Sequence, residues 1–271
     1  MHAAIATQAG SQDAPNEDWA GVLVPGLAVV LDGLSAPDGT GTGCRHGTPW
    51  FVSQLGPRVL AQAADPARSL VDALAEAIQQ VGSLHPGCDL KHPGTPSATM
   101  VLLRARDGGA DYLALADAVL VLDTADGLQV VSDERVSQLA GKEREAANRV
   151  PTGSALKLRR RAQLTRALRR ARNRPGGYWV AAADPQAASQ ALTGSLPSKT
   201  LRHAVLLSDG ASRLVDLFGL ATWEELLALL DESGPDELLR QVRAAEAVDP
   251  EGRQWPRTKR SDDATAVYLQ R

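Results

Sequence analysis

Apolar residues gather along this chain in short runs that alternate with stretches of helical periodicity. The near-continuous apolar runs at 27–31 and 204–207 are typical of buried strands. The full set of predicted strands is 2–8, 19–24, 27–32, 98–104, 111–116, 119–123, 128–131, 178–182, 203–207 and 264–269. Apolar residues at helical spacing predict helices from Trp50 to Leu60 and over 66–81. Helices are also predicted over 133–146 and 155–172, which are strongly charged, and over 214–218, 223–230 and 235–247. Strands grouped early and late, with helices between them and no long linker, predict layered α/β packing in one domain.

Composition narrows the class of protein. The chain has 271 residues, of which 44% are apolar and 23% charged, enough apolar material for a full core. The net charge of −3 disfavours general electrostatic binding to nucleic acid or to a membrane surface. The two cysteines, Cys44 and Cys88, form no disulfide framework and indicate a reducing compartment. With no leader-like or membrane-spanning segment in the sequence, we expect a soluble, cytoplasmic protein.

Acidic clusters stand at the ends of several apolar runs. They are Asn16-Glu17-Asp18, Asp32-Gly33, Ser208-Asp209-Gly210 and Ser261-Asp262-Asp263. Any one of them alone could be an ordinary turn. A carboxylate at the end of a buried strand is costly unless something neutralises it, and oxygen ligands suit Mg²⁺ or Mn²⁺ better than zinc. Together the clusters predict a carboxylate-bound, binuclear metal site.

The order of these motifs along the chain resembles a known family. In sequence they are Asn16-Glu17-Asp18, Val29-Val30-Leu31-Asp32-Gly33, Ser97-Ala98-Thr99, Leu115-Ala116-Asp117-Ala118, Leu206-Leu207-Ser208-Asp209-Gly210 and Asp262-Asp263-Ala264-Thr265. This order and spacing resemble the metal-dependent protein phosphatases, the PPM or type 2C family of Ser/Thr phosphatases, from about residue 3 to 270. The resemblance implies an α+β fold: a four-layer α-β-β-α sandwich with two antiparallel sheets flanked by helices. It also implies one phosphatase domain over 1–271.

The resemblance further implies two Mg²⁺ or Mn²⁺ ions in a cleft at one end of the sandwich. Asp32 would bridge both ions, and the carbonyl of Gly33 would join the shell of one of them. Asp209 and Asp262 would hold the other ion, which Glu17 would reach directly or through water.

Other expectations follow from the same resemblance. Asp18 would lie behind the ligands and complete a catalytic set with Asp32 and Asp209, and Asp117 would help bind a third, weaker ion. The reaction would be hydrolysis of phosphoserine or phosphothreonine by a hydroxide that bridges the metals. We expect a bacterial-style monomer that acts on phosphoprotein substrates of a cognate Ser/Thr kinase system.

Three positions depart from the family's pattern. Asp13 stands where an Arg often grips the substrate phosphate, Leu34 where a His often follows Asp-Gly, and Ala116-Asp117-Ala118 where Gly-Asp-Ser is usual. We expect weaker phosphate binding, with Arg45 as a candidate substitute. An alternative is a weak or inactive pseudophosphatase that binds phosphoproteins or regulates a kinase. A haloacid-dehalogenase-like enzyme is disfavoured, because the second Asp of its motif would fall at Leu34.

Three further features have more than one interpretation. The basic stretch 158–174 is either a solvated helix face or a docking surface, and it lies in a segment, 133–175, that resembles the family's variable flap. His85, Cys88 and His92 share one loop that could suggest zinc, but Pro-Gly turns explain this loop and no fourth ligand is evident. His46 is either a helix cap or a proton donor near Asp32.

Overall fold

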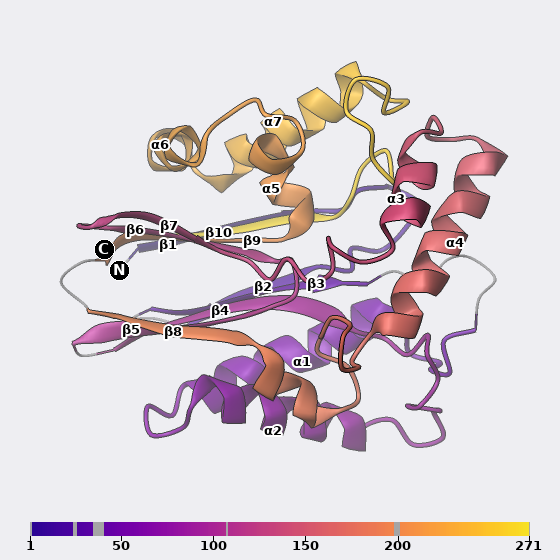
Figure 1. The fold of residues 1–271 in the computed structure, drawn as a ribbon. Helices are drawn as coiled ribbons and strands as arrows, with labels where there is room; N and C mark the ends of the chain where they lie inside the picture. The colour runs from indigo at the N-terminus through magenta and orange to yellow at the C-terminus, as the bar shows by residue number, and fades with distance from the viewer. Residues whose placement is uncertain (1, 24–25, 35–40, 107, 198–200, 271) are drawn as a thin grey trace.

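The computed structural model describes residues 2–23, 26–34, 41–106, 108–197 and 201–270, and these form two antiparallel sheets with helices outside them (Figure 1). The first sheet has the order β1 (His2–Gln8), β10 (Ala264–Gln270), β9 (Leu201–Leu207), β6 (Val119–Thr124) and β7 (Gly127–Val131). The second has the order β2 (Trp19–Leu23), β3 (Leu27–Gly33), β4 (Ala98–Arg106), β5 (Gly109–Leu115) and β8 (Leu192–Pro197). The predicted four-layer α+β sandwich is confirmed.

The central strands, such as β3, β4 and β10, pack on both faces, which explains their near-continuous apolar sequences. Successive side chains of a strand point to opposite faces, so Val29 and Leu31 of β3 face the outer helices while Ala28 and Val30 face the other sheet. Between the sheets, Val30 meets the apolar side of β6, β9 and β10, including Leu120 and Leu206. Each fully buried side chain of this kind contributes about 1.5–3 kcal/mol relative to exposure.

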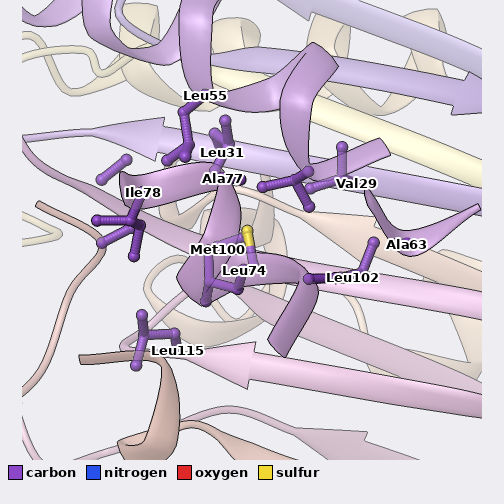
Figure 2. Packing of buried hydrophobic residues seen from close by; sticks show 14 of the residues in the cluster. Val29, Leu31, Leu55, Ala63, Leu74, Ala77, Ile78, Met100, Leu102 and Leu115 are labelled. Carbon is purple, nitrogen blue, oxygen red and sulfur yellow. The ribbon is translucent and has the colours of Figure 1, made fainter. Parts of the chain in front are cut away.

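Two helices cover the outer face of the second sheet. These are α1 (Gly47–Ala63) and α2 (Leu70–Ser83), and Leu55 of α1 with Leu74 and Ile78 of α2 packs on β3 and β4 (Figure 2). The first sheet is covered in the same way by α5 (Asp209–Asp216), α6 (Trp223–Ser233) and α7 (Pro235–Val248). The packing of α1 on β3 also fixes the strand end that carries Asp32.

The helices α3 (Gly141–Asn148) and α4 (Ala155–Ala171) lie at one end of the two sheets and not over an outer face (Figure 1). Both belong to the segment that resembles a flap. Their position brings α4 close to the ends of strands from both sheets.

Some predicted boundaries are wrong. Residues 178–182 form no strand, only isolated bridges at Tyr178 and Ala181, whereas β8 was not predicted. In 133–146 the helix begins only at Gly141, and α2 begins at Leu70 because the Ser69 side chain caps it by accepting from the Asp72 N–H. Within the described ranges, we find no helix that is both long and apolar enough to cross a membrane.

Candidate active site

Four aspartates from separate segments line one cleft. Asp32 lies at the end of β3, Asp117 in the turn between β5 and β6, Asp209 at the first turn of α5 and Asp262 just before β10. The cleft has a volume of about 180 Å³. The pairing of β9 with β10 and the packing of β3 of the other sheet against them place these strand ends together, although the residues are up to 230 positions apart in sequence.

Gly33 is fitted closely to the loop that carries Glu17. The Gly33 N–H donates to the Glu17 carbonyl oxygen at 3.1 Å. A Cβ at position 33 would lie 2.4 Å from that oxygen and 2.5 Å from Cγ2 of Thr48, so a side chain would displace one of them. Glycine is therefore required here for the close approach of two backbones.

Asp263 fastens the same loop to the start of β10. Its carboxylate accepts the backbone N–H of Gly10 at 2.8 Å and that of Glu17 at 2.7 Å.

Asp18, which follows Glu17 in the chain, is buried, with only 7% of its surface exposed. Within the described part of the chain, neither Asp18 carboxylate oxygen has a well-formed hydrogen bond. A buried carboxylate of this kind is costly unless a cation lies nearby.

Nearby cations do not fully neutralise the negative charge of the carboxylates in and beside the cleft. Burial, and then the charges of Asp209 and Asp18, raise the pKa of Asp32 well above its ordinary value. Burial raises the pKa of both Asp18 and Asp117 to about 7, and it also raises that of Asp209. Divalent cations would offset this repulsion, so these residues fit Mg²⁺ or Mn²⁺.

Asp262 differs from the other three because it already has cationic partners. Arg213 Nη2 lies 2.8 Å from its Oδ2, and the Lys259 ammonium donates to its Oδ1. Burial alone would raise the pKa of Asp262, but Lys259 and Arg213 outweigh it and the net pKa is lowered. A metal ion at Asp262 would therefore have to displace Arg213 and Lys259 or share the Asp262 carboxylate with them.

One face of α4 forms the opposite wall of the cleft. Its lining positions recur at helical spacing; they are Arg161, Leu164, Thr165, Leu168 and Arg169, and Arg172, directly after the helix, also lines the cleft. Arg172 is held by Ser97 and the carbonyls of Pro93 and Thr95. Arg161 has no hydrogen bond or ion pair with any described residue, so its guanidinium is available to an anion.

Most of the predicted site residues meet at this cleft. Asp32, Gly33, Asp117, Asp209 and Asp262 line it, while Glu17 and Asp18 lie beside it on the loop that Asp263 holds.

Two residues considered from the sequence lie elsewhere. Arg45 is exposed, and neither it nor His46 lines the cleft.

Sequence reasoning missed several cleft residues, among them Lys259, Arg144 and Tyr178. The signal for Arg161 was available in its helical spacing with Leu164 and Leu168, which pairs charge with apolar residues on one face. No comparable sequence signal marks Lys259.

A four-layer sandwich with carboxylates converging on one cleft is the architecture expected for a metal-dependent phosphatase. A family model for protein phosphatase 2C matches residues 3–245, and the chain belongs to this family. No curated protein sequence matches it at a significant level.

Solved bacterial proteins, Ser/Thr phosphatases among them, share the fold at low sequence identity. A serine/threonine phosphatase from Staphylococcus aureus is 12% identical with a TM-score of 0.58, and the match covers 99% of this chain and 94% of that one. PppA, described as a key regulatory component of T6SS in Pseudomonas aeruginosa, is 20% identical with a TM-score of 0.56 over 99% and 96% of the two chains. The PPM Ser-Thr phosphatase MsPP from Mycobacterium smegmatis is 18% identical with a TM-score of 0.53 over 100% and 98%. At these identities the likeness supports the fold.

Proposed function

We propose that this protein is a metal-dependent Ser/Thr phosphatase that hydrolyses phosphomonoesters on proteins. The observation that supports this most is the convergence of Asp32, Asp117, Asp209 and Asp262 on one cleft, opposite the available guanidinium of Arg161. Carboxylates on one wall suit cations, and a guanidinium on the other suits a phosphate.

In this proposal the acidic residues hold the metals. Asp32 would serve both Mg²⁺ or Mn²⁺ ions, the Gly33 carbonyl would join one of them, and Asp209 and Asp262 would hold the other, which Glu17 would reach directly or through water. When bound, the ions would polarise the phosphate and lower the pKa of water.

Two neighbouring carboxylates would support these ligands. Asp117 would hold a third, weaker ion, and Asp18 would add negative charge behind Asp32 and Asp209 that a bound cation offsets.

The positive wall would take the role of the missing family Arg. Asp13 is exposed and does not line the cleft, whereas Arg161 does. We assign phosphate binding to Arg161 and substrate selection to the flap-like segment 133–175 that carries it. Phosphoserine and phosphothreonine proteins of a cytoplasmic kinase system would be the substrates, and the chain would act as a monomer.

The pseudophosphatase alternative also has one supporting observation. Lys259 and Arg213 neutralise Asp262 without a metal, which lowers the electrostatic gain from binding an ion there. A protein of this kind would bind a metal or a phosphoprotein without turnover.

The test is hydrolysis of a phosphothreonine peptide with Mn²⁺, with Mg²⁺ and with EDTA. We expect metal-dependent turnover, and a loss of about 100-fold or more in Asp209→Asn, because metal stabilisation of the transition state contributes several kcal/mol. Asp126→Asn, the same chemical change in the exposed β6–β7 hairpin, is the matched control and should keep wild-type activity. Near-normal turnover in Asp209→Asn would overturn the metal assignment. Metal binding by calorimetry without turnover in the wild type would favour the pseudophosphatase.

A further inference from the structure

A second group of metal-type ligands lies outside the cleft. Cys44 and His46 come from the loop before α1, and His85 and Cys88 from the loop after α2. Each offers one ligand atom, and these four atoms all lie within 4.8 Å of one another. In the described part of the chain, no other set of three or more Cys, His, Asp or Glu residues meets this criterion.

Four of the six distances between ligand atoms in this Cys/His cluster are close to those of a tetrahedral zinc site, and the other two are within 4.8 Å. The two sulfurs are 3.8 Å apart, and Sγ of Cys44 lies 3.6 Å from Nδ1 of His46 and 3.4 Å from Nδ1 of His85. Sγ of Cys88 lies 3.7 Å from Nδ1 of His46. Ideal Zn–S and Zn–N bonds of about 2.3 and 2.0–2.1 Å at tetrahedral angles place sulfurs roughly 3.8 Å apart and sulfur and nitrogen roughly 3.5–3.6 Å apart. A disulfide would need sulfurs about 2.05 Å apart.

The surroundings hold these side chains in place. Trp50 stacks on His46 with ring centroids 4.2 Å apart and meets His85 edge-on at 4.7 Å. The His46 backbone N–H points at Sγ of Cys44 at 3.4 Å, an orientation that stabilises a thiolate. Arg45 Nε lies 3.4 Å from Nε2 of His46, and metal binding through Nδ1 would open this exposed contact because Nε2 would then carry a proton.

The backbone also brings the two loops together. The Asp89 N–H donates to the Gly43 carbonyl at 2.8 Å. Gly43 has φ +71°, and a Cβ there would lie 2.5 Å from the Asp89 carbonyl oxygen. The crossing of the loops therefore requires glycine next to Cys44.

We propose that Cys44, His46, His85 and Cys88 bind one structural Zn²⁺ that joins the N-terminal end of α1 to the C-terminal end of α2. Two thiolates and two imidazoles select zinc over Mg²⁺ and Mn²⁺, which prefer oxygen. Four protein ligands leave no position for a substrate, so the ion stabilises and does not catalyse. It fixes α1, which packs on the strand that carries Asp32.

The test measures metal content in protein purified without a polyhistidine tag and without added metal. We expect about one zinc per chain in the wild type by mass spectrometry. His85→Ala should lose zinc, while His92→Ala, the same change at a loop histidine outside the cluster, should keep it. Asp209→Asn should also keep its zinc, which separates this site from the proposed phosphatase metals.

Cobalt gives a second readout on the wild type and on the Cys44→Ser, Cys88→Ser double variant. Co²⁺ should produce intense tetrahedral visible bands and a thiolate charge-transfer band in the wild type, and neither in the double variant. If the variants fail to fold, the wild type alone decides: stripping with a strong chelator should lower its Tm, and Zn²⁺ but not Mg²⁺ should restore it. A zinc-free wild type without a thiolate–Co²⁺ band, with its sulfurs free or joined in a disulfide, would overturn the proposal. So would zinc content that is unchanged in the cysteine variant.

Discussion

Asp263 does not line the cleft, yet we predict that it controls metal affinity. Its two oxygens hold the backbone N–H groups of Gly10 and Glu17 at 2.8 and 2.7 Å. The Glu17 carbonyl in turn accepts from Gly33, beside Asp32. The position of the Glu17 side chain therefore depends on the carboxylate of Asp263.

The substitution Asp263→Asn keeps one acceptor oxygen and turns an NH₂ group toward the other N–H. One hydrogen bond to a charged group is lost, which costs roughly 1.5–3 kcal/mol. If this cost falls on the metal-bound arrangement of the loop, the Mn²⁺ affinity drops roughly ten- to a hundredfold. The chemistry at saturating metal is unaffected, because no substrate contact is removed.

The assay is a Mn²⁺ titration of phosphothreonine-peptide hydrolysis, with Mn²⁺ binding by electron paramagnetic resonance as a readout independent of turnover. We expect a higher half-saturating Mn²⁺ concentration and little change in kcat. Asp13→Asn is the matched control, since Asp13 is exposed in the same loop, and it should leave the titration unchanged. An unchanged half-saturating concentration in folded Asp263→Asn would refute the argument.

Two further predictions concern stability and substrate binding. Burial would raise the pKa of Asp249, but the N–H groups of residues 253–255 and the Arg257 guanidinium outweigh it and lower the pKa from 3.8 to about 2. A lowered pKa gives stability that is present above the unfolded value and lost as pH falls through the folded one. Asp249→Asn should therefore lower the free energy of unfolding by about 2 kcal/mol at neutral pH. The difference in unfolding free energy between variant and wild type should shrink from about pH 4 toward pH 2. A pH-independent difference in urea melts would contradict this. Arg161→Ala should raise KM for a phosphopeptide roughly ten- to a hundredfold, while Arg45→Ala, outside the cleft, should not; equal KM values in both variants would remove Arg161 from phosphate binding.

Where the sequence predicted strands well, burial on both faces made the signal strong. Strands β3 and β10, and β9 from Ala204 on, are apolar at nearly every position because each lies between a sheet and a helix layer. The strand β8 was missed because it pairs only with β5 at the sheet edge and several of its side chains are exposed. Residues 178–182 carry the opposite error: Tyr178 and Val180 are buried beneath α4 without joining a sheet.

The two candidate sites differ in how much of their residue composition the sequence could predict. Each acidic motif lies at or beside the end of a strand, and the family resemblance of their order predicted the shared cleft. The Cys/His cluster joins Cys44 and His46 to residues about 40 positions later. The packing of α1 against α2 and the backbone hydrogen bond from Asp89 to Gly43 bring the two loops together, and neither can be read from the sequence. His92, which the loop motif suggested as a ligand, instead accepts the Gly94 N–H on Nδ1 at 3.0 Å. Spacing within the loop suggested a zinc site only to be set aside for want of a fourth ligand, because Cys44 and His46 lie in a different loop.

The two metal environments differ in the property that selects an ion. The cleft offers carboxylates, which exchange Mg²⁺ and Mn²⁺ readily, whereas the cluster offers thiolates and imidazoles, which retain zinc. A brief exposure to EDTA should then remove only the cleft ions, and Mn²⁺ alone should restore turnover. Stronger chelation would reach the zinc, loosen the contact between α1 and α2, and leave a protein that Mn²⁺ alone cannot reactivate, because the strand carrying Asp32 has lost part of its support. The order in which activity and thermal stability disappear thus distinguishes a metal that takes part in the reaction from one that holds the fold.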